Sequence, residues 1–270
     1  MDFDIVINTP DNTVDMKTGL NTMQGASEVL RVATDAVLTG HVPARKSHRS
    51  SVRTSLKKSF PGSYGHTFSL DVHDPDLKTK LDTIGHDTFI ETITYLVEEA
   101  LYINHGRILS KAAQAVIDNL GNSYDTLLNK LRQSPLKGLH ESANRFNFSA
   151  KLRYRKSDTE QTIIKEVDRS TAKALNTKNN RRKQDIVACI TRFNIHTGNG
   201  RLLIKGHDET IPFSISIPYK DVKFETKQVF SDNLGANNGI APDSRVYLDL
   251  RARSIDAYGG YVVKYIIIGV

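Results

Sequence analysis

Apolar residues in the first part of the chain occur either in short β-prone runs, which predict strands, or at every third or fourth position, which predicts helices. Residues 3–7 are a short β-prone run followed by Pro10-Asp11-Asn12, a turn composition, and they predict a first strand. Between residues 20 and 38, and again between 87 and 104, apolar side chains recur every three or four positions and a glycine follows. This spacing puts the apolar side chains on one face, so both segments are predicted to be amphipathic helices.

The next segments continue this mixture of helix and strand. Residues 108–120 and 124–131 keep the helical period and predict a helical hairpin. Residues 145–155 alternate apolar side chains with arginine and lysine, which predicts a half-buried strand with a basic outer face. The residues Ser157-Asp158-Thr159-Glu160 have the spacing of a capping box, so we expect a helix from there to about Leu175.

The second part of the chain has a different pattern. Residues 176–183 hold no apolar side chain and several turn formers, so they predict a linker. Because closure into a barrel removes exposed strand edges, the five or six short strands that follow predict a small β-barrel-like domain. The sequence therefore predicts an α+β protein, with a mixed α/β domain at 1–178 and the barrel at 184–270. The β-rich runs are 186–195, 201–205, 210–217, 222–229, 245–254 and 261–268.

Composition places the chain among ordinary globular proteins. It has 270 residues, of which 39% are hydrophobic and 25% charged, a size and balance that suit two folded domains. The single cysteine, Cys189, has no partner for an internal disulfide, and no apolar run is long enough to cross a bilayer. The start Met1-Asp2-Phe3-Asp4 is acidic and no apolar stretch follows it, unlike a secretory signal. We expect a cytoplasmic protein without a membrane partner.

Charge gives the main functional indication. The net charge is +7, and lysines and arginines gather at 45–58, 145–156 and 178–183, the first without any acid between His41 and His66. Basic side chains near phosphates release condensed counterions, which favours DNA or RNA of any sequence. Each cluster also fits a solvated surface or linker, and that alternative stays open. The predicted phosphate contacts are Arg45, Lys46, Arg49, Arg53, Lys57, Lys58, Arg153, Arg155, Arg181 and Arg182.

Residues 59–65, Ser-Phe-Pro-Gly-Ser-Tyr-Gly, follow the first basic cluster and precede an alternating stretch at 67–72. Hydroxyls, glycines and two aromatic rings suit contact with a phosphate or a base, through Phe60 and Tyr64. A hairpin turn requires the same proline and glycine for its backbone. Both interpretations remain open.

Residues 190–213 resemble the opening of a cold-shock or OB-type barrel. A strand ends at Phe193-Asn194, the turn Gly198-Asn199-Gly200 follows, and Ile211-Pro212-Phe213 lies where such barrels place an apolar-aromatic strand. The resemblance implies a small barrel in which aromatic side chains near the glycines stack on bases. Here the matching positions hold Asn199 and Arg201. The candidate base or ligand contacts of this hairpin are Phe193 and Arg201, and a purely structural hairpin is the alternative.

The whole chain loosely resembles uncharacterised bacterial proteins with an α/β body and a small barrel. Some of those are accessory components of multi-protein systems, including antiviral ones. This resemblance implies an alternative function, a protein–protein interaction or sensor subunit whose C-terminal module contacts another protein.

The chain lacks a recognisable catalytic motif. It contains no Gly-x-Ser-x-Gly elbow and no glycine-rich phosphate loop, and its nine histidines include no pair at helical i, i+4 spacing. The carboxylate pairs Glu98-Glu99 and Asp74/Asp76 fall on the polar side of a predicted helix and in a turn. We therefore expect no metal or cofactor and a non-catalytic nucleic-acid-binding protein, although acids gathered only by the fold would create an active site that sequence does not show.

Overall fold

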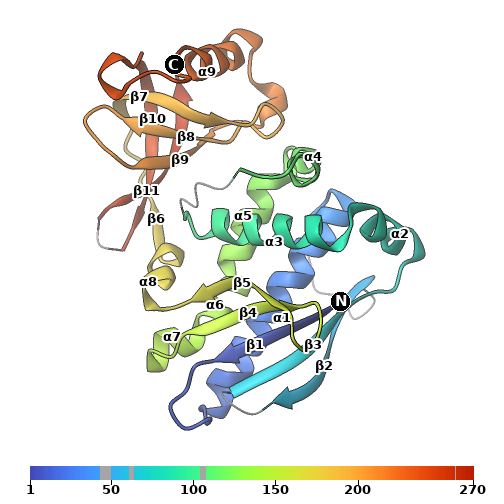
Figure 1. Cartoon of the computed structure of the whole chain (residues 1–270). Helices are drawn as coiled ribbons and strands as arrows, with labels where there is room; N and C mark the ends of the chain where they lie inside the picture. The colour runs from blue at the N-terminus through green and yellow to red at the C-terminus, as the bar shows by residue number, and fades with distance from the viewer. Residues whose placement is uncertain (43–49, 61–63, 104–107, 259) are drawn as a thin grey trace. The chain divides into compact units, whose positions relative to one another are not determined.

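The computed structural model describes residues 1–42, 50–60, 64–103, 108–258 and 260–270. It divides into two compact units, Met1–Leu175 and Asn176–Val270. The first combines a sheet with helices, and the second is built around a closed five-stranded barrel (Figure 1). The predicted α+β class, with an α/β region followed by a small barrel, is therefore confirmed.

The sheet of the first unit has five strands in the order β2-β3-β1-β4-β5, and all neighbours are antiparallel. Strands β1 and β2 therefore run in the same direction, are joined through α1, and have β3 between them, which is a split β-α-β unit. The strands are β1 (Asp2–Ile7), β2 (Val52–Phe60), β3 (Tyr64–Val72), β4 (Ala150–Arg155) and β5 (Gln161–Val167).

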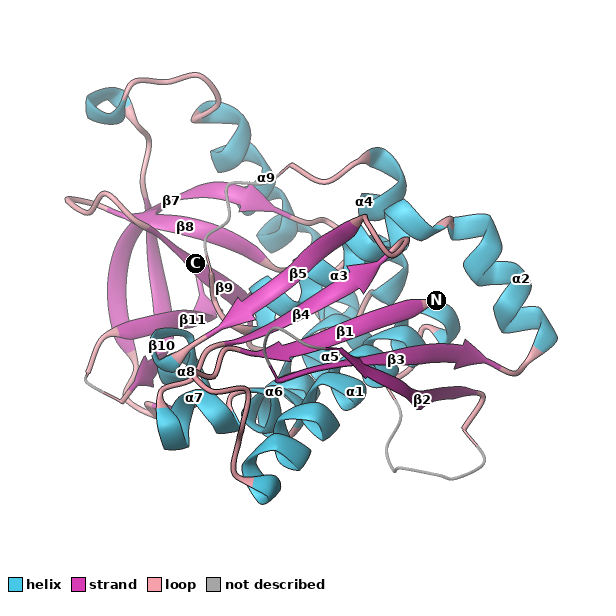
Figure 2. Cartoon of the chain, turned by 60° about the horizontal axis from the view of Figure 1, so that its bottom comes forward, coloured by secondary structure: helices cyan, strands magenta, loops and turns pink. Residues whose placement is uncertain are grey.

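Helices cover one face of this sheet, with α1, α3, α5 and α6 behind the strands in Figure 2. Alternate side chains of β1, namely Phe3, Ile5 and Ile7, are at most 1% exposed and belong to the core that these helices complete. The opposite face of the sheet carries mostly polar side chains. The helices are α1 (Met16–Thr39), α2 (Pro75–Ile84), α3 (His86–Ala100), α4 (Lys111–Leu120), α5 (Ser123–Gln133), α6 (Pro135–Leu139), α7 (Glu141–Phe146) and α8 (Arg169–Ala172), followed by the 3-10 helix Lys173–Leu175.

The barrel of the second unit closes in the order β7-β8-β9-β11-β10, with β10 returning to β7. Only β9 and β11 pair in parallel among its neighbours. Strand β6 (Thr177–Asn179) pairs with the end of β10 and adds a short strand outside the closed wall. The barrel strands are β7 (Gln184–Phe193), β8 (Gly200–Ile204), β9 (Thr210–Ile215), β10 (Leu248–Ala257) and β11 (Val262–Gly269).

Helix α9 (Phe224–Ala236) connects β9 to β10 and packs against β7. Its Phe230 is fully buried among the barrel side chains. Asn233 is also buried, and its Oδ1 accepts a hydrogen bond of 2.8 Å from the Ile190 N–H, next to a register shift in β7. The side chain thus satisfies a backbone donor that the β7–β8 pairing leaves free. Short 3-10 helices at Tyr219–Asp221 and Pro242–Ser244 complete the unit.

Several sequence-based assignments differ from the structure. The strand expected over 145–155 begins only at Ala150, because α7 runs to Phe146. The turn expected around Pro75 is the start of α2, with Asp74 as its N-cap. The helix expected from Ser157 is wrong, because the Ser157 Oγ accepts the Glu160 N–H at 3.0 Å within a turn and β5 follows. The β-rich run 222–229 is wrong as a strand, because α9 occupies it. The predicted linker at 176–183 includes strand β6, since backbone pairing needs no apolar side chain.

Candidate nucleic-acid interface

The first predicted basic cluster lies only partly within the described structure. Arg45, Lys46 and Arg49 lie outside the described residues. Arg53, Lys57 and Lys58 belong to β2, an edge strand of the sheet. The positions of these three side chains can be compared with those of Arg153 and Arg155 on β4.

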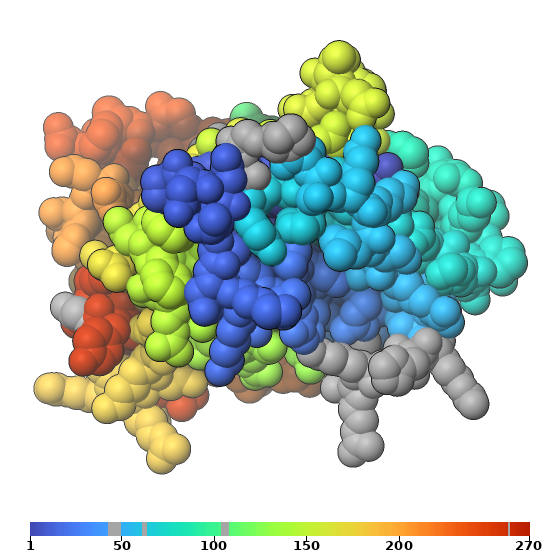
Figure 3. Space-filling view, turned by 90° about the horizontal axis from the view of Figure 1, so that it is seen from below, coloured from blue at the N-terminus to red at the C-terminus, as the bar shows by residue number. Residues whose placement is uncertain are grey.

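Strand register brings the β2 and β4 cations onto the same open face of the sheet. Lys58 lies opposite Thr67 of β3, Thr67 opposite Asp4 of β1, and Asp4 opposite Arg153 of β4. Four strands thus contribute to one row. In the space-filling view, the yellow-green chain around the β4–β5 turn stands beside the cyan β2–β3 hairpin, although the sequence separates them widely (Figure 3).

The centre of this row is Asp4, whose side chain is completely buried. Arg155 binds it in a bidentate manner, with Nε to Oδ1 and Nη2 to Oδ2, both at 2.9 Å. Arg153 Nη2 donates to Oδ2 at 3.1 Å, and Thr67 Oγ1 donates to Oδ1 at 2.9 Å. The hydrogen bonds to Asp4 raise the pKa of Arg155. A buried carboxylate is thus balanced by two guanidinium groups, which is the condition for its burial.

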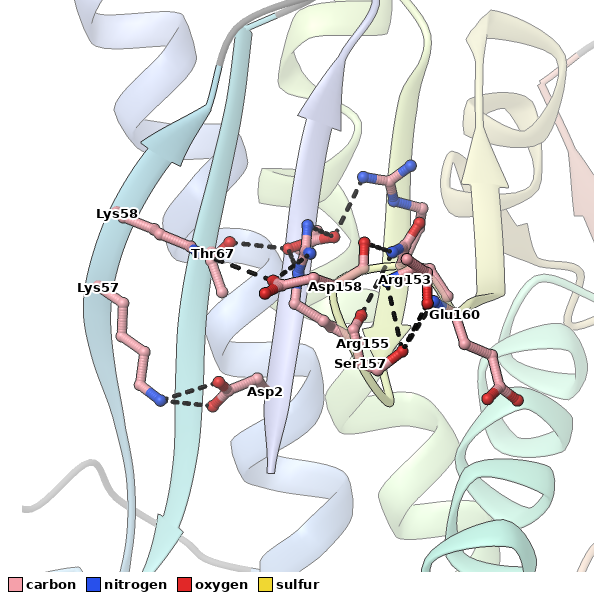
Figure 4. Close-up of polar contacts among 12 residues, drawn as sticks. Asp2, Lys57, Lys58, Thr67, Arg153, Arg155, Ser157, Asp158 and Glu160 are labelled. Carbon is pink, nitrogen blue, oxygen red and sulfur yellow. Dashed lines mark hydrogen bonds and ion pairs between the residues drawn. The ribbon is translucent and has the colours of Figure 1, made fainter.

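The lysines of this face are paired as well (Figure 4). Lys57 Nζ donates to both carboxylate oxygens of Asp2, at 2.7 and 2.9 Å. Lys58 and Arg155 approach Asp158 at 3.8 and 3.3 Å. A phosphate on this face would therefore compete with carboxylates that are already in place.

The aromatic candidates beside this face have neighbours in the fold. The Phe60 ring lies directly over Gly65, where a Cβ would be 2.4 Å from the ring, so a larger residue at that cross-strand position would displace the ring. The same ring is 5.8 and 5.5 Å from the guanidinium carbons of Arg153 and Arg155. Tyr64 stands edge-on to His66 at 4.9 Å. Base contact by Phe60 or Tyr64 stays a prediction.

The candidates of the β7–β8 hairpin are part of the barrel packing. Phe193 stacks on Phe213 and Phe230 at 6.2 and 5.4 Å, and Tyr219 meets its ring edge-on. Arg201 is 5% exposed, and it donates from Nε and Nη2 to Thr210 Oγ1 and O. These side chains hold strands and helix together, and a ligand role for them remains a prediction.

Arg181 and Arg182 have a different environment. They lie in the segment 180–183 between β6 and β7, two strands that pair with the same strand β10. Asn180 fixes the segment, since its N–H donates to Ser254 O at 2.9 Å, its Nδ2 donates to Asp256, and its Oδ1 accepts the Arg182 N–H. Arg181, Arg182 and Lys183 are exposed. None of the three forms an ion pair with a residue in the described part of the chain.

We call Lys178, Arg181, Arg182, Lys183 and Arg253 the bulge patch, because residues 181–183 lie between the β6 and β7 pairings with β10, at the level of Arg253. Residues 176–270 hold 14 lysines and arginines and nine aspartates and glutamates, and thus carry five of the seven net positive charges. The barrel unit is therefore the more basic of the two, and the patch groups several of its cations that have no ion pair with a described residue.

Sequence reasoning missed two aromatic side chains next to this patch. Tyr258 and Tyr261 are 87% and 51% exposed at the β10–β11 turn. The sequence identifies this turn from Tyr258-Gly259-Gly260 for its glycines alone. The sequence feature that could have indicated them is a pair of aromatic residues flanking a turn, since turn residues are usually polar.

The first unit also has a surface hollow of about 550 Å³ beside the start of α3. Its lining includes Asp87, Tyr154 and Lys156, and the hydroxyl of Tyr154 is 3.5 Å from His86 Nδ1. Across the described ranges, no group of three or more His, Cys, Asp or Glu side chains is arranged to hold a metal ion. None of the described helices has the length and apolar character needed to cross a membrane. No protein-family model, curated protein or solved structure matches the chain.

Proposed function

We propose that this chain is a non-catalytic nucleic-acid-binding protein whose principal phosphate contacts come from the bulge patch. The observation that carries the proposal is the fixed, exposed run Arg181-Arg182-Lys183, which has no acidic partner among the described residues. Phosphates supply the missing counter-charge and release condensed ions when they bind. The excess of basic residues in the barrel unit supports the same assignment.

We also propose that the barrel is of the OB type. Five strands close the wall, and the third strand in sequence, β9, neighbours the fifth, β11, instead of the fourth, which is a Greek-key connection. OB-type barrels are five-stranded Greek-key barrels that commonly bind oligonucleotides. The resemblance of residues 190–213 supports this proposal from the sequence side.

The predicted contacts on the sheet of the first unit rank below those of the patch. Lys57 and Lys58 have 47% and 62% exposed side chains, and a solvated ion pair exchanges its partner at little cost. Arg153 and Arg155 would leave Asp4 buried and uncompensated if they turned to a phosphate, and this is strongly unfavourable. We assign auxiliary contacts to the lysines and a structural role to the two arginines.

Charge reversal tests the assignment. The variant Arg181→Glu/Arg182→Glu should lower affinity for DNA and RNA, and the slope of log affinity against log salt should become shallower by about 1.4–1.8, since each of two phosphate contacts contributes about 0.7–0.9. Lys220→Glu/Lys223→Glu is a matched control with the same change of charge at two exposed positions of the same unit. Equal losses in the two variants would show that net charge alone matters and would refute a contact at the patch.

A protein–protein interaction subunit is the second candidate. The observation in its favour is the exposure of apolar side chains on the barrel unit, including Ile195 at 60%, Ile217 at 49% and Phe224 at 67%. Affinity purification of the full chain after nuclease treatment tests it. A stoichiometric protein partner that Phe224→Ser weakens would support this candidate, and loss of all bound material on nuclease treatment would contradict it.

A further inference from the structure

Two tyrosines at the end of the β10–β11 hairpin are exposed, Tyr258 almost completely and Tyr261 about half. Tyr258 is 87% exposed and Tyr261 is 51% exposed. Neither ring stacks on another aromatic ring within the described residues. The hairpin end is held by backbone hydrogen bonds, from Tyr258 N–H to Asn176 O and from Ala257 N–H to Tyr261 O, both at 2.9 Å. The rings are thus presented by fixed backbone.

The fold places these rings next to the bulge patch. Strand β6 pairs with the end of β10, with Lys178 opposite Asp256 and Thr177 opposite Ala257. At about 3.3 Å per residue, Lys178 lies about 7 Å from Tyr258 along the strands, and Arg253 about 16 Å. Cations and rings therefore follow one another along a three-stranded ribbon of β6 and the ends of β10 and β11, a length that accommodates a few nucleotides.

The ribbon also holds unsatisfied polar atoms. Arg253 Nε and Asp256 Oδ1 are buried and have no hydrogen-bond partner among the described residues. Buried donors and acceptors are rarely left unpaired in a protein interior, so each such atom needs an explanation, for example an ordered water or an ion. The unpaired atoms of Arg253 and Asp256 are an observation independent of the exposed rings, and both residues belong to the part of β10 that precedes Tyr258.

We infer that the ribbon binds single-stranded nucleic acid, with Tyr258 and Tyr261 stacking on unpaired bases while Lys178, Arg181 and Arg182 hold the phosphates. The inference rests on the proposed nucleic-acid function and specifies its ligand. A duplex offers phosphates, but its base faces are stacked on one another, so the tyrosine rings cannot stack on them. The site differs from the β7–β8 hairpin that the barrel resemblance indicates, where the partly buried Phe193 packs its ring on Phe213 and Phe230.

Binding of the full chain to three probes tests this inference: a thymidine oligonucleotide, an abasic strand of equal length, and a duplex of equal length. Tyr258→Ala and Tyr261→Ala should each weaken binding to the thymidine strand by about 5- to 140-fold, which corresponds to one stacked base. Binding to the abasic strand and the duplex should not change. Tyr258→Phe and Tyr261→Phe keep the ring and should retain affinity.

Phe224→Ala removes an exposed ring from α9, at the other end of the barrel from β6 (Figure 1), and should leave all three affinities unchanged. Salt-sensitive binding that is equal for strand and duplex and insensitive to both alanine variants would overturn the single-strand inference and leave the proposed function standing. Absence of binding to every probe at low salt would overturn both.

Discussion

Replacement of Asp4 by asparagine isolates the charge at the centre of the first unit's open face. The change keeps the shape of the side chain and one acceptor for Thr67, but it leaves the guanidinium groups of Arg153 and Arg155 without their anion. Asp4 is fully buried, and the two arginine side chains are only 22% and 13% exposed. Breaking a buried pair by removing one partner costs about 3–5 kcal/mol. Because both arginines retain some solvent contact and Arg155 keeps Asp158, we expect the lower end of this range.

Hydrogen exchange followed by mass spectrometry measures this loss separately for each unit. About 3 kcal/mol corresponds to roughly 100-fold faster exchange of the most protected amides of β1 and β4, since each 1.4 kcal/mol is tenfold. Peptides from β8 and β10 serve as an internal reference and should not change. Asp158→Asn is the matched control, because its carboxylate is 84% exposed and its pairs are worth at most about 1 kcal/mol. Equal effects of the two substitutions would refute the reasoning that Arg153 and Arg155 are held mainly by Asp4.

Two further changes test other parts of the structure. The ring nitrogens of His140 contact Leu136 O and Thr171 Oγ1, and burial lowers the pKa of this side chain. Near and below pH 6.5 the unfolded chain therefore binds more protons than the folded chain. The unfolding free energy of the first unit should fall as the pH drops through 6. His66 adds to this trend, and a pH slope that His140→Gln does not reduce would contradict the assignment. In the barrel, a Cβ on Gly200 would be 2.1 Å from the backbone oxygen of Arg192. Gly200→Ala should therefore destabilise the barrel unit by about 3 kcal/mol or more. An unchanged melting temperature would contradict this close approach of β7 and β8.

The parts of the fold that follow from the sequence are those in which local pattern and tertiary packing agree. The apolar stripe of residues 20–38 predicts the core-facing side of α1, and the run of short strands predicts the barrel. The capping-box pattern at Ser157 fails because the same hydroxyl-to-amide bond closes a turn, while β-branched Thr162 and Ile163 pair with β4. Helix α9 is missed because it buries only Phe230 and Asn233, which is too few side chains for a helical period.

The candidate site follows the sequence less closely, for a physical reason. A basic residue has the same letter whether its charge is free or neutralised, and the partners of Lys57, Lys58 and Arg155 come from β1 and the β4–β5 turn. Pairings of such long sequence separation depend on strand register, which one sequence does not specify. The unpaired state of Arg181 and the exposure of Tyr258 likewise become apparent only in the fold.

The most direct test of the account is the affinity of the full chain for single-stranded DNA or RNA, measured by fluorescence anisotropy between about 50 and 200 mM salt. The account predicts log affinity that falls linearly with log salt, and a smaller slope for Arg181→Glu/Arg182→Glu than for the Lys220→Glu/Lys223→Glu control. Absence of binding at the lowest salt, or identical slopes for the two variants, would contradict a nucleic-acid interface at the bulge patch.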